Sequence, residues 1–250
     1  MKGVCVLNIE ALTDVGKVRK INEDSYDVFV SDSYSYAVVA DGMGGHLAGE
    51  VASAMAVKAI GEYIKDNLKD DFDRFQTKEI INKAFKKANG EIYNFSCENE
   101  RVMGMGTTAT LCMIRDGYLI YAHIGDSRAY MIGKNINQIT NDHSYVQELV
   151  KIGQITPEEA KHHPRRNYIT RAMGVEKTVK ADSGIKVYNG EKVLICSDGL
   201  HGEIDDIELY NCVNKNKAAD SLKLLIALAN DRGGGDNITA VIMEGERTDA

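Results

Sequence analysis

The sequence contains no hydrophobic run that approaches the length of a membrane span, and it has only two prolines. Its first residues, MKGVCVLNIEALTD, turn polar after a few apolar positions and therefore lack the core of a signal peptide. These absences predict a cytoplasmic protein without membrane insertion. Hydrophobic residues make up 44% of the chain, which suffices for a buried core, and no linker divides residues 1–250 into separate domains.

An excess of positive charge is also absent. The 30 Lys and Arg residues are outnumbered by 37 Asp and Glu residues, which gives a net charge of −7 without any basic block. This balance disfavours nucleic acid and anionic membranes as partners. A cationic ligand suits the chain better.

The five cysteines are an odd number and have no CxxC spacing, so we expect reduced thiols in the core. None is followed by arginine six positions later, as in enzymes that attack phosphate through a cysteine. The sequence therefore gives no support for covalent thiol chemistry on phosphate.

Strand-like segments occur in groups, with helical segments between and after the groups. The expected strands are residues 3–13, 26–30, 36–40, 107–115, 118–124, 128–132, 184–189, 192–197 and 238–243. Two amphipathic helices separate the first two groups, one with Ile60 and Ile64 on its apolar face and one that follows a Thr77 cap. A second helix pair is expected near 204–213 and 216–229. Because strands and helices do not alternate strictly, the pattern indicates an α+β fold.

Residues 140–182 form a polar segment that contains both prolines and is rich in His, Lys and Arg. Thr156, Pro157 and Glu159 match a capping box at the start of a short helix. We interpret this segment as a surface excursion from the domain.

Four aspartates each close an apolar run and open a turn that contains glycine or serine: Asp41 in VVADGMGG, Asp126 in AHIGDSRAY, Asp198 in VLICSDGL and Asp236 in GGGDNITAV. Any one of them alone is most often an ordinary turn residue. Several carboxylates at one edge of a sheet, however, repel one another unless a cation neutralises them. Magnesium and manganese prefer hard oxygen ligands of this kind, so the set predicts a divalent-metal site.

The same residues suggest a reaction. Asp41 and Gly42 offer a carboxylate that can bridge two ions and an unhindered carbonyl, and Asp198 and Asp236 could complete the shell of a second ion. Two ions about 3.5–4 Å apart can activate a water for in-line attack on phosphorus. Phosphate itself needs a cationic partner, and Arg19 in TDVGKVRKINEDSY is the natural candidate because a guanidinium matches two phosphoryl oxygens. The alternative for Arg19 is an ordinary surface ion pair.

Eight motifs follow one another along the chain: TDVGKVRKINEDSY, VVADGMGGHLAGE, MGTTAT, HIGDSRAY, NDHS, RNYITRAMG, CSDGL and DNIT. From about Thr13 to Met243 they resemble the metal-dependent serine/threonine protein phosphatases of type 2C, in particular the free-standing bacterial members. The resemblance implies a four-layer αββα sandwich, with two mostly antiparallel β-sheets flanked by helices. It also implies hydrolysis of phosphoserine and phosphothreonine in proteins by a water that bridges two Mg²⁺ or Mn²⁺ ions. In signalling, such enzymes typically oppose a serine/threonine kinase and act on it and its targets, and we expect a monomer.

Carried over motif by motif, the resemblance assigns a role to each matching residue. Arg19 would bind the substrate phosphate, and Asn237 would support the last loop. The metal ligands would be Glu23 through a water, the bridging Asp41, the carbonyl of Gly42, Asp198 and Asp236, with Asp126 and Asp198 at a third, weaker position.

The chain departs from the family pattern at two positions. Some relatives have a histidine, assigned as the general acid, where this chain has Met43. His46 is a nearby candidate for that catalytic role, or else it simply starts the following helix. The second departure is His201, where many relatives carry threonine.

Two other functions stay open on the sequence alone. One is a phosphoprotein-binding module that has kept the fold and lost turnover, although no metal carboxylate is missing. The other is a metallohydrolase for small phosphorylated metabolites. In the family, residues 140–182 correspond to a flap beside the catalytic cleft, and four basic side chains there either attract acidic phosphoprotein segments or are merely solvated: Lys161, Arg165, Arg166 and Arg171.

Overall fold

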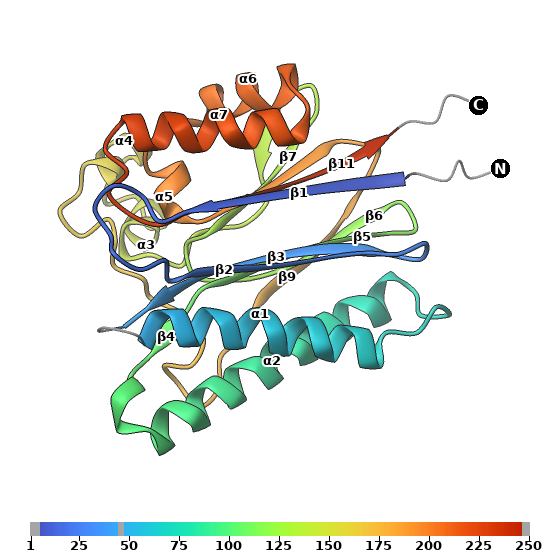
Figure 1. The fold of residues 1–250 in the computed structure, drawn as a ribbon, viewed down its shortest axis with the longest axis horizontal. Coiled ribbons are helices and arrows are strands. Elements are labelled where there is room, and N and C mark those ends of the chain that lie inside the picture. The colour runs from blue at the N-terminus through green and yellow to red at the C-terminus, as the bar shows by residue number, and fades with distance from the viewer. Residues whose placement is uncertain (1–5, 45–47, 247–250) are drawn as a thin grey trace.

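Two antiparallel β-sheets pack face to face in the computed structural model, which describes residues 6–44 and 48–246 (Figure 1). One sheet has the strand order β1 (Val6–Asp14), β11 (Ile238–Glu246), β10 (Lys192–Cys196), β7 (Arg128–Ile132) and β8 (Ile136–Gln138). The other has the order β2 (Asp24–Val30), β3 (Ser35–Met43), β5 (Ala109–Arg115), β6 (Tyr118–Ile124) and β9 (Asp182–Val187), with β4 (Gly106–Thr107) paired to β3.

Helices cover the outer face of each sheet. α1 (Ala48–Asn67) and α2 (Arg74–Glu98) pack on the sheet that contains β3, and α6 (Asp206–Lys215) and α7 (Ala218–Asp231) pack on the other (Figure 1). The layers therefore run helix, sheet, sheet, helix, which confirms both the α+β class and the four-layer sandwich. None of the helices described is both long and apolar enough to span a lipid bilayer.

The second helix, α2, begins at a different cap from the predicted one. Asp73 Oδ1 accepts hydrogen bonds from the backbone N–H groups of Phe75 and Gln76, each at 2.8 Å, and the Gln76 side chain accepts from the Asp73 N–H at 2.9 Å. Thr77 is fully buried inside the first turn. The prediction of a Thr77 cap was wrong because Asp73, four residues earlier, already satisfies the free N–H groups of the helix start.

The strands at the centre of the sandwich are buried on both faces. Residues 36–40 of β3 have no exposed surface, because one face packs against the α1 and α2 layer and the other against the second sheet. Val39, for example, belongs to the same buried cluster as Val193 and Val241. This double burial explains why the strand is a continuous apolar run in the sequence instead of alternating with polar residues.

The excursion contains two short helices, α3 (Tyr145–Lys151) and α4 (Pro157–Lys161), and its base is closed by a bridge between Ser144 and Ile169. The predicted capping box at α4 is confirmed. Thr156 Oγ1 accepts from the Glu159 N–H at 3.2 Å, and Glu159 Oε2 accepts from the Thr156 N–H at 2.7 Å. Two further short elements are η1 (Glu100–Val102) after α2 and α5 (Asp198–His201) after β10.

One edge of the sandwich collects the turns that carry the predicted site. Because neighbouring strands are antiparallel, the end of β3 lies beside the start of β5, which in turn lies beside the end of β6. In the other sheet, Cys196 at the end of β10 pairs with Arg128 and with Ala240. A 2.8 Å hydrogen bond from Ser197 Oγ to Asp24 Oδ2 connects the two sheets at this edge.

Candidate metal centre

Four strand ends bring the predicted aspartates to this edge. Asp41 lies near the end of β3, Asp126 in the turn from β6 to β7, Asp198 at the start of α5, and Asp236 just before β11. Burial raises the pKa of Asp41 well above its usual value, and the charges of Asp24, Asp198, Asp126 and Asp236 raise it further. The structure therefore places the other three predicted carboxylates within electrostatic range of Asp41.

The pKa values of Asp198 and Asp126 are raised in the same way. Burial, and then the charge of Asp236, raises the pKa of Asp198 to about 6. Burial, and then the charge of Asp198, raises the pKa of Asp126 well above its usual value. These shifts mean that the ionised carboxylates lack sufficient counter-charge from the protein itself. A divalent cation is the kind of ligand that would supply it.

Four buried carboxylate oxygens at this edge have no hydrogen-bond partner among the described residues: Glu23 Oε1, Asp24 Oδ1, Asp126 Oδ1 and Asp198 Oδ1. Such oxygens are costly to bury unsatisfied, and a hard cation can satisfy several at once. Within residues 6–44 and 48–246, no three His, Cys, Asp or Glu side chains already enclose an ion position. Mg²⁺ takes oxygen donors of the kind present at this edge and keeps several water ligands. The same oxygen donors suit Mn²⁺.

Two glycines allow the loops of the site to approach closely. A Cβ atom on Gly42 would lie 2.1 Å from the backbone oxygen of Gly49, and one on Gly199 would lie 2.1 Å from the backbone oxygen of Asn237. The Gly42 N–H also donates to the Glu23 carbonyl at 3.1 Å. Any side chain at either glycine would force these loops apart.

Arg19 lies at the rim of the carboxylate edge. Its Nη2 donates to Asp236 Oδ2 at 2.8 Å, and this bond is the main cause of a raised Arg19 pKa, with further contributions from the charges of Glu23 and Asp198. The Arg19 side chain is 49% exposed, and its guanidinium makes no other hydrogen bond within the described ranges. The predicted ion-pair alternative is therefore present, and it leaves N–H groups available for a phosphoryl group.

Asn237 connects the Arg19 loop to the Asp236 loop. Its Oδ1 accepts from the Glu23 N–H at 2.8 Å, and its Nδ2 donates to the carbonyls of Val15 and Ile21, each at 3.0 Å. One amide side chain therefore fixes three backbone groups of the loop that carries Arg19 and Glu23.

Asp24 is a site residue that the sequence patterns did not reveal. It pairs with Asp41 across β2 and β3, it is 9% exposed, and burial raises its pKa to about 7. Its signal was the acidic pair Glu23–Asp24 in NEDSY, immediately at the start of a strand. The register that sets Asp24 opposite Asp41 is not visible in that pattern.

The general acid stays a prediction, because His46 lies outside the described residues. Met43, at the position where some relatives carry histidine, pairs with Gly106 across β3 and β4. A thioether has no proton to give to a leaving group. Met43 therefore does not replace the histidine of those relatives in this role.

Three of the four basic side chains of the excursion, residues 140–182, contact neighbouring side chains. Arg171 Nη1 donates to Asp182 Oδ1 at 2.8 Å, and Lys161 Nζ donates to Glu158 Oε2 at 2.9 Å. Arg165 stacks over Tyr145, with its guanidinium carbon 5.7 Å from the ring centroid. The cluster is therefore partly neutralised by its own neighbours, which favours the solvated alternative for Lys161 and Arg171.

Comparison with known proteins gives one consistent result. The family model described as Protein phosphatase 2C matches residues 17–241. The chain is 36% identical over 249 residues to a serine/threonine phosphatase stp of Listeria monocytogenes, with 97% of each chain covered. It is 38% identical over 248 residues to the protein phosphatase PhpP of Streptococcus pneumoniae, with 98% of this chain and 100% of that protein covered.

Solved structures agree with the sequence matches. The serine/threonine phosphatase Stp1 from Staphylococcus aureus superposes with a TM-score of 0.91 at 37% identity, covering 96% of this chain and 95% of that one. The catalytic domain of the serine threonine protein phosphatase PstP, in complex with two manganese ions, superposes with a TM-score of 0.84 at 35% identity, covering 96% and 98%.

Proposed function

The chain belongs to the protein phosphatase 2C family, and from this membership we propose that it hydrolyses phosphoserine and phosphothreonine in proteins and that it needs Mg²⁺ or Mn²⁺ to do so. The observation that carries the proposal is the edge of mutually repelling carboxylates with unpartnered buried oxygens. The manganese complex of a similar phosphatase supports the choice of metal.

The ligand set is the one that the resemblance to the family implies, and the unpartnered oxygens of Glu23, Asp126 and Asp198 support it. Asp41 would hold both ions, with the Gly42 carbonyl and, through a water, Glu23 on one ion and Asp198 and Asp236 on the other. When bound, two such ions supply charge neutralisation and an activated water for in-line attack on phosphorus. Asp126 and Asp198 would form a third, weaker position, which their unsatisfied oxygens support.

The phosphate is held by the protein itself. The N–H groups of Arg19 that Asp236 does not use can bind two phosphoryl oxygens, and the fork geometry orients the phosphorus toward the carboxylate edge. Asp236 in turn orients Arg19, and Asn237 holds the Arg19 loop to the Asp236 loop. The leaving alkoxide needs a proton, and His46 is our candidate for its donor.

We place this activity in the cytoplasm, in a monomer with one catalytic domain over residues 1–250 and the flap-like excursion at about 140–182. Its partners in signalling would be a serine/threonine kinase and the phosphorylated targets of that kinase. These extensions rest on the sequence patterns and on the similarity to the bacterial phosphatases named above.

The proposal is tested with purified protein and a phosphothreonine peptide. Hydrolysis should require Mn²⁺ or Mg²⁺, should stop with EDTA, and should fall to background in Asp41→Ala because both ions lose their shared ligand. Activity that survives EDTA or Asp41→Ala would contradict it. Tight, metal-dependent peptide binding without phosphate release would indicate a binding module, and faster hydrolysis of sugar phosphates would indicate a metabolite phosphatase.

A further inference from the structure

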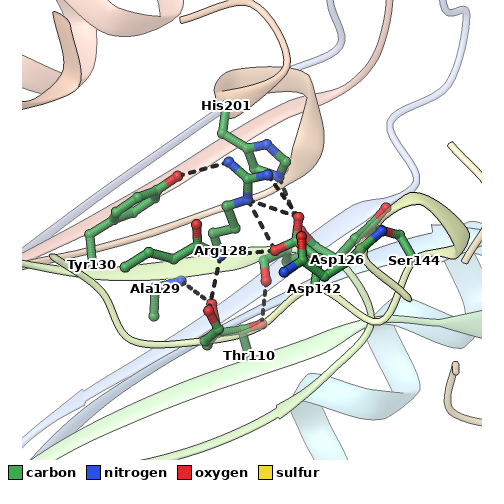
Figure 2. A network of polar contacts seen from close by, with 12 residues as sticks. Thr110, Asp126, Arg128, Ala129, Tyr130, Asp142, Ser144 and His201 are labelled. Atoms are coloured by element: carbon green, nitrogen blue, oxygen red, sulfur yellow. Dashed lines mark hydrogen bonds and ion pairs between the residues drawn. The ribbon is translucent and has the colours of Figure 1, made fainter. Parts of the chain in front are cut away.

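His201 connects two of the loops that carry the carboxylates. It is the last residue of α5, the short helix that Asp198 begins, and its Nε2 lies 3.0 Å from the backbone oxygen of Asp126 (Figure 2). Since a carbonyl oxygen only accepts hydrogen bonds, Nε2 must carry the hydrogen. The side chain that closes the Asp198 helix therefore donates to the turn that carries Asp126.

The imidazole lies beside a network of polar contacts around Arg128. Arg128 donates to both carboxylate oxygens of Asp142, through Nε at 3.0 Å to each and through Nη2 at 2.7 Å to Oδ2, and its Nη1 reaches Tyr130 Oη at 3.3 Å (Figure 2). The Nε2–H of His201 is used on the Asp126 carbonyl, beside this network.

The hydrogen bond acts on a pair of interacting carboxylates. Asp126 Oδ1 and Asp198 Oδ1 are both buried and have no hydrogen-bond partner among the described residues. After burial, the charge of Asp198 is the main cause of the raised pKa of Asp126. α5 is a single turn, closed by a 2.7 Å bond from the Gly202 N–H to the Asp198 carbonyl, so a restraint at His201 is transmitted to Asp198.

We propose that His201 is a positioning residue for a cation held between Asp126 and Asp198, because its hydrogen bond to the Asp126 carbonyl sets the separation of those two carboxylates. The proposal rests on the metal-dependent function proposed above and goes beyond it by assigning a role to a residue that departs from the family pattern. Removal of a residue that orients a metal ligand typically lowers metal affinity about 10–100-fold. The two ions held by Asp41 share only Asp198 with this position, and no hydrogen bond joins His201 to Asp41 or Asp236 within the described ranges. Their affinity should therefore fall much less than that of the cation between Asp126 and Asp198.

The test is calorimetric titration of the full chain with Mn²⁺ alone. The wild type should show one class of tight Mn²⁺ sites and one class of weaker Mn²⁺ sites. Asp126→Asn, which removes a ligand, should lose the weaker class. His201→Leu, which fills a similar volume without a donor, should weaken that class about 10–100-fold. His201→Gln, whose amide can still donate, should restore it. Tyr130→Phe is the matched control, because it removes the far end of the same network and leaves the His201 bond intact.

Three outcomes would overturn the inference: an unchanged affinity of the weaker class in His201→Leu, an equal loss of affinity in His201→Gln, or a loss of affinity in the tight class as large as that in the weaker class. If His201→Leu does not fold, as judged by thermal melting in EDTA, the comparison of His201→Gln with Asp126→Asn decides, since loss of the weaker class in both contradicts the proposal. A wild type that binds Mn²⁺ tightly and hydrolyses phosphopeptide, but has no weaker class, overturns this inference alone. A wild type without Mn²⁺-dependent hydrolysis overturns the proposed function instead.

Discussion

The guanidinium of Arg19 offers five N–H donors, and Asp236 takes one of them. A charge-assisted hydrogen bond is worth about 1.5–3 kcal/mol, so loss of the phosphate contact should raise KM for a phosphopeptide about tenfold or more. Both Arg19→Ala and Arg19→Lys should show this, because a lysine keeps the charge and loses the planar fork. Steady-state kinetics measure KM, and Mn²⁺ titration should show unchanged metal affinity.

The control for Arg19 is its neighbour Lys17, which pairs with Asp231 at 3.6 Å on the same loop and is well exposed. Lys17→Ala should leave KM unchanged. If Arg19→Ala abolished Mn²⁺ binding, the residue would serve mainly to hold Asp236, and the phosphate role would be wrong.

Individual carboxylates were predictable from the sequence because a strand end is a local feature. Asp41 and Asp198 each stand where an apolar run meets a glycine, and the structure places both at the same edge. Asp24 was not predictable, because its importance comes from a register that sets it opposite Asp41. His201 was noticed as a departure, but its contact with the Asp126 carbonyl depends on how two separate loops meet.

The capping box of α2 gives a prediction for a single helix. Asp73→Ala should lower the free energy of unfolding by about 1 kcal/mol, because two backbone N–H groups lose their acceptor. Urea denaturation measures the change. The rate of phosphopeptide hydrolysis should not change, since α2 starts beside Arg115 and Tyr118, at the edge opposite the carboxylates.

Asp71→Ala is the matched control for this helix, because it removes an exposed negative charge two residues away and no capping bond. Its effect on stability should be much smaller than that of Asp73→Ala. Equal effects would mean that charge near the helix start matters, not the cap.

Helices and strands were predictable to different degrees. The apolar faces of α1 and α7 repeat at helical spacing and were found, whereas the cap of α2 was misplaced because Thr77 also fits the residue preferences of a cap. Strand pairing could not be predicted from the periodicity of the sequence. β1 and β11 are adjacent in the sheet and come from opposite ends of the chain, and alternation of residues says only that a strand exists, not which strand it pairs with.

For the molecule as a whole, ionised carboxylates gathered at one edge lower the stability of the metal-free folded protein. The folded protein binds protons at Asp24 and Asp198 more tightly than the unfolded chain does, since their pKa values rise from about 3.8 to about 7 and about 6. Stability gained in this way is fully present below about pH 3.8 and is lost as the pH rises through these folded-state values. Cations that bind the ionised carboxylates act in the opposite direction.

The metal-free protein should therefore lose stability between about pH 5 and pH 7.5, and Mn²⁺ should raise its melting temperature more at pH 7.5 than at pH 5. Thermal melting in EDTA and in Mn²⁺ at both pH values measures this. Asp24→Asn should flatten the pH dependence in EDTA, because one buried carboxylate no longer ionises and its oxygen can still accept from Ser197. Asp32→Asn, in the exposed turn between β2 and β3, should behave as the wild type does. If Mn²⁺ raised the melting temperature equally at the two pH values, and the melting temperature in EDTA did not vary with pH, these carboxylates would not lack counter-charge. The electrostatic argument for a metal at this edge would then be wrong.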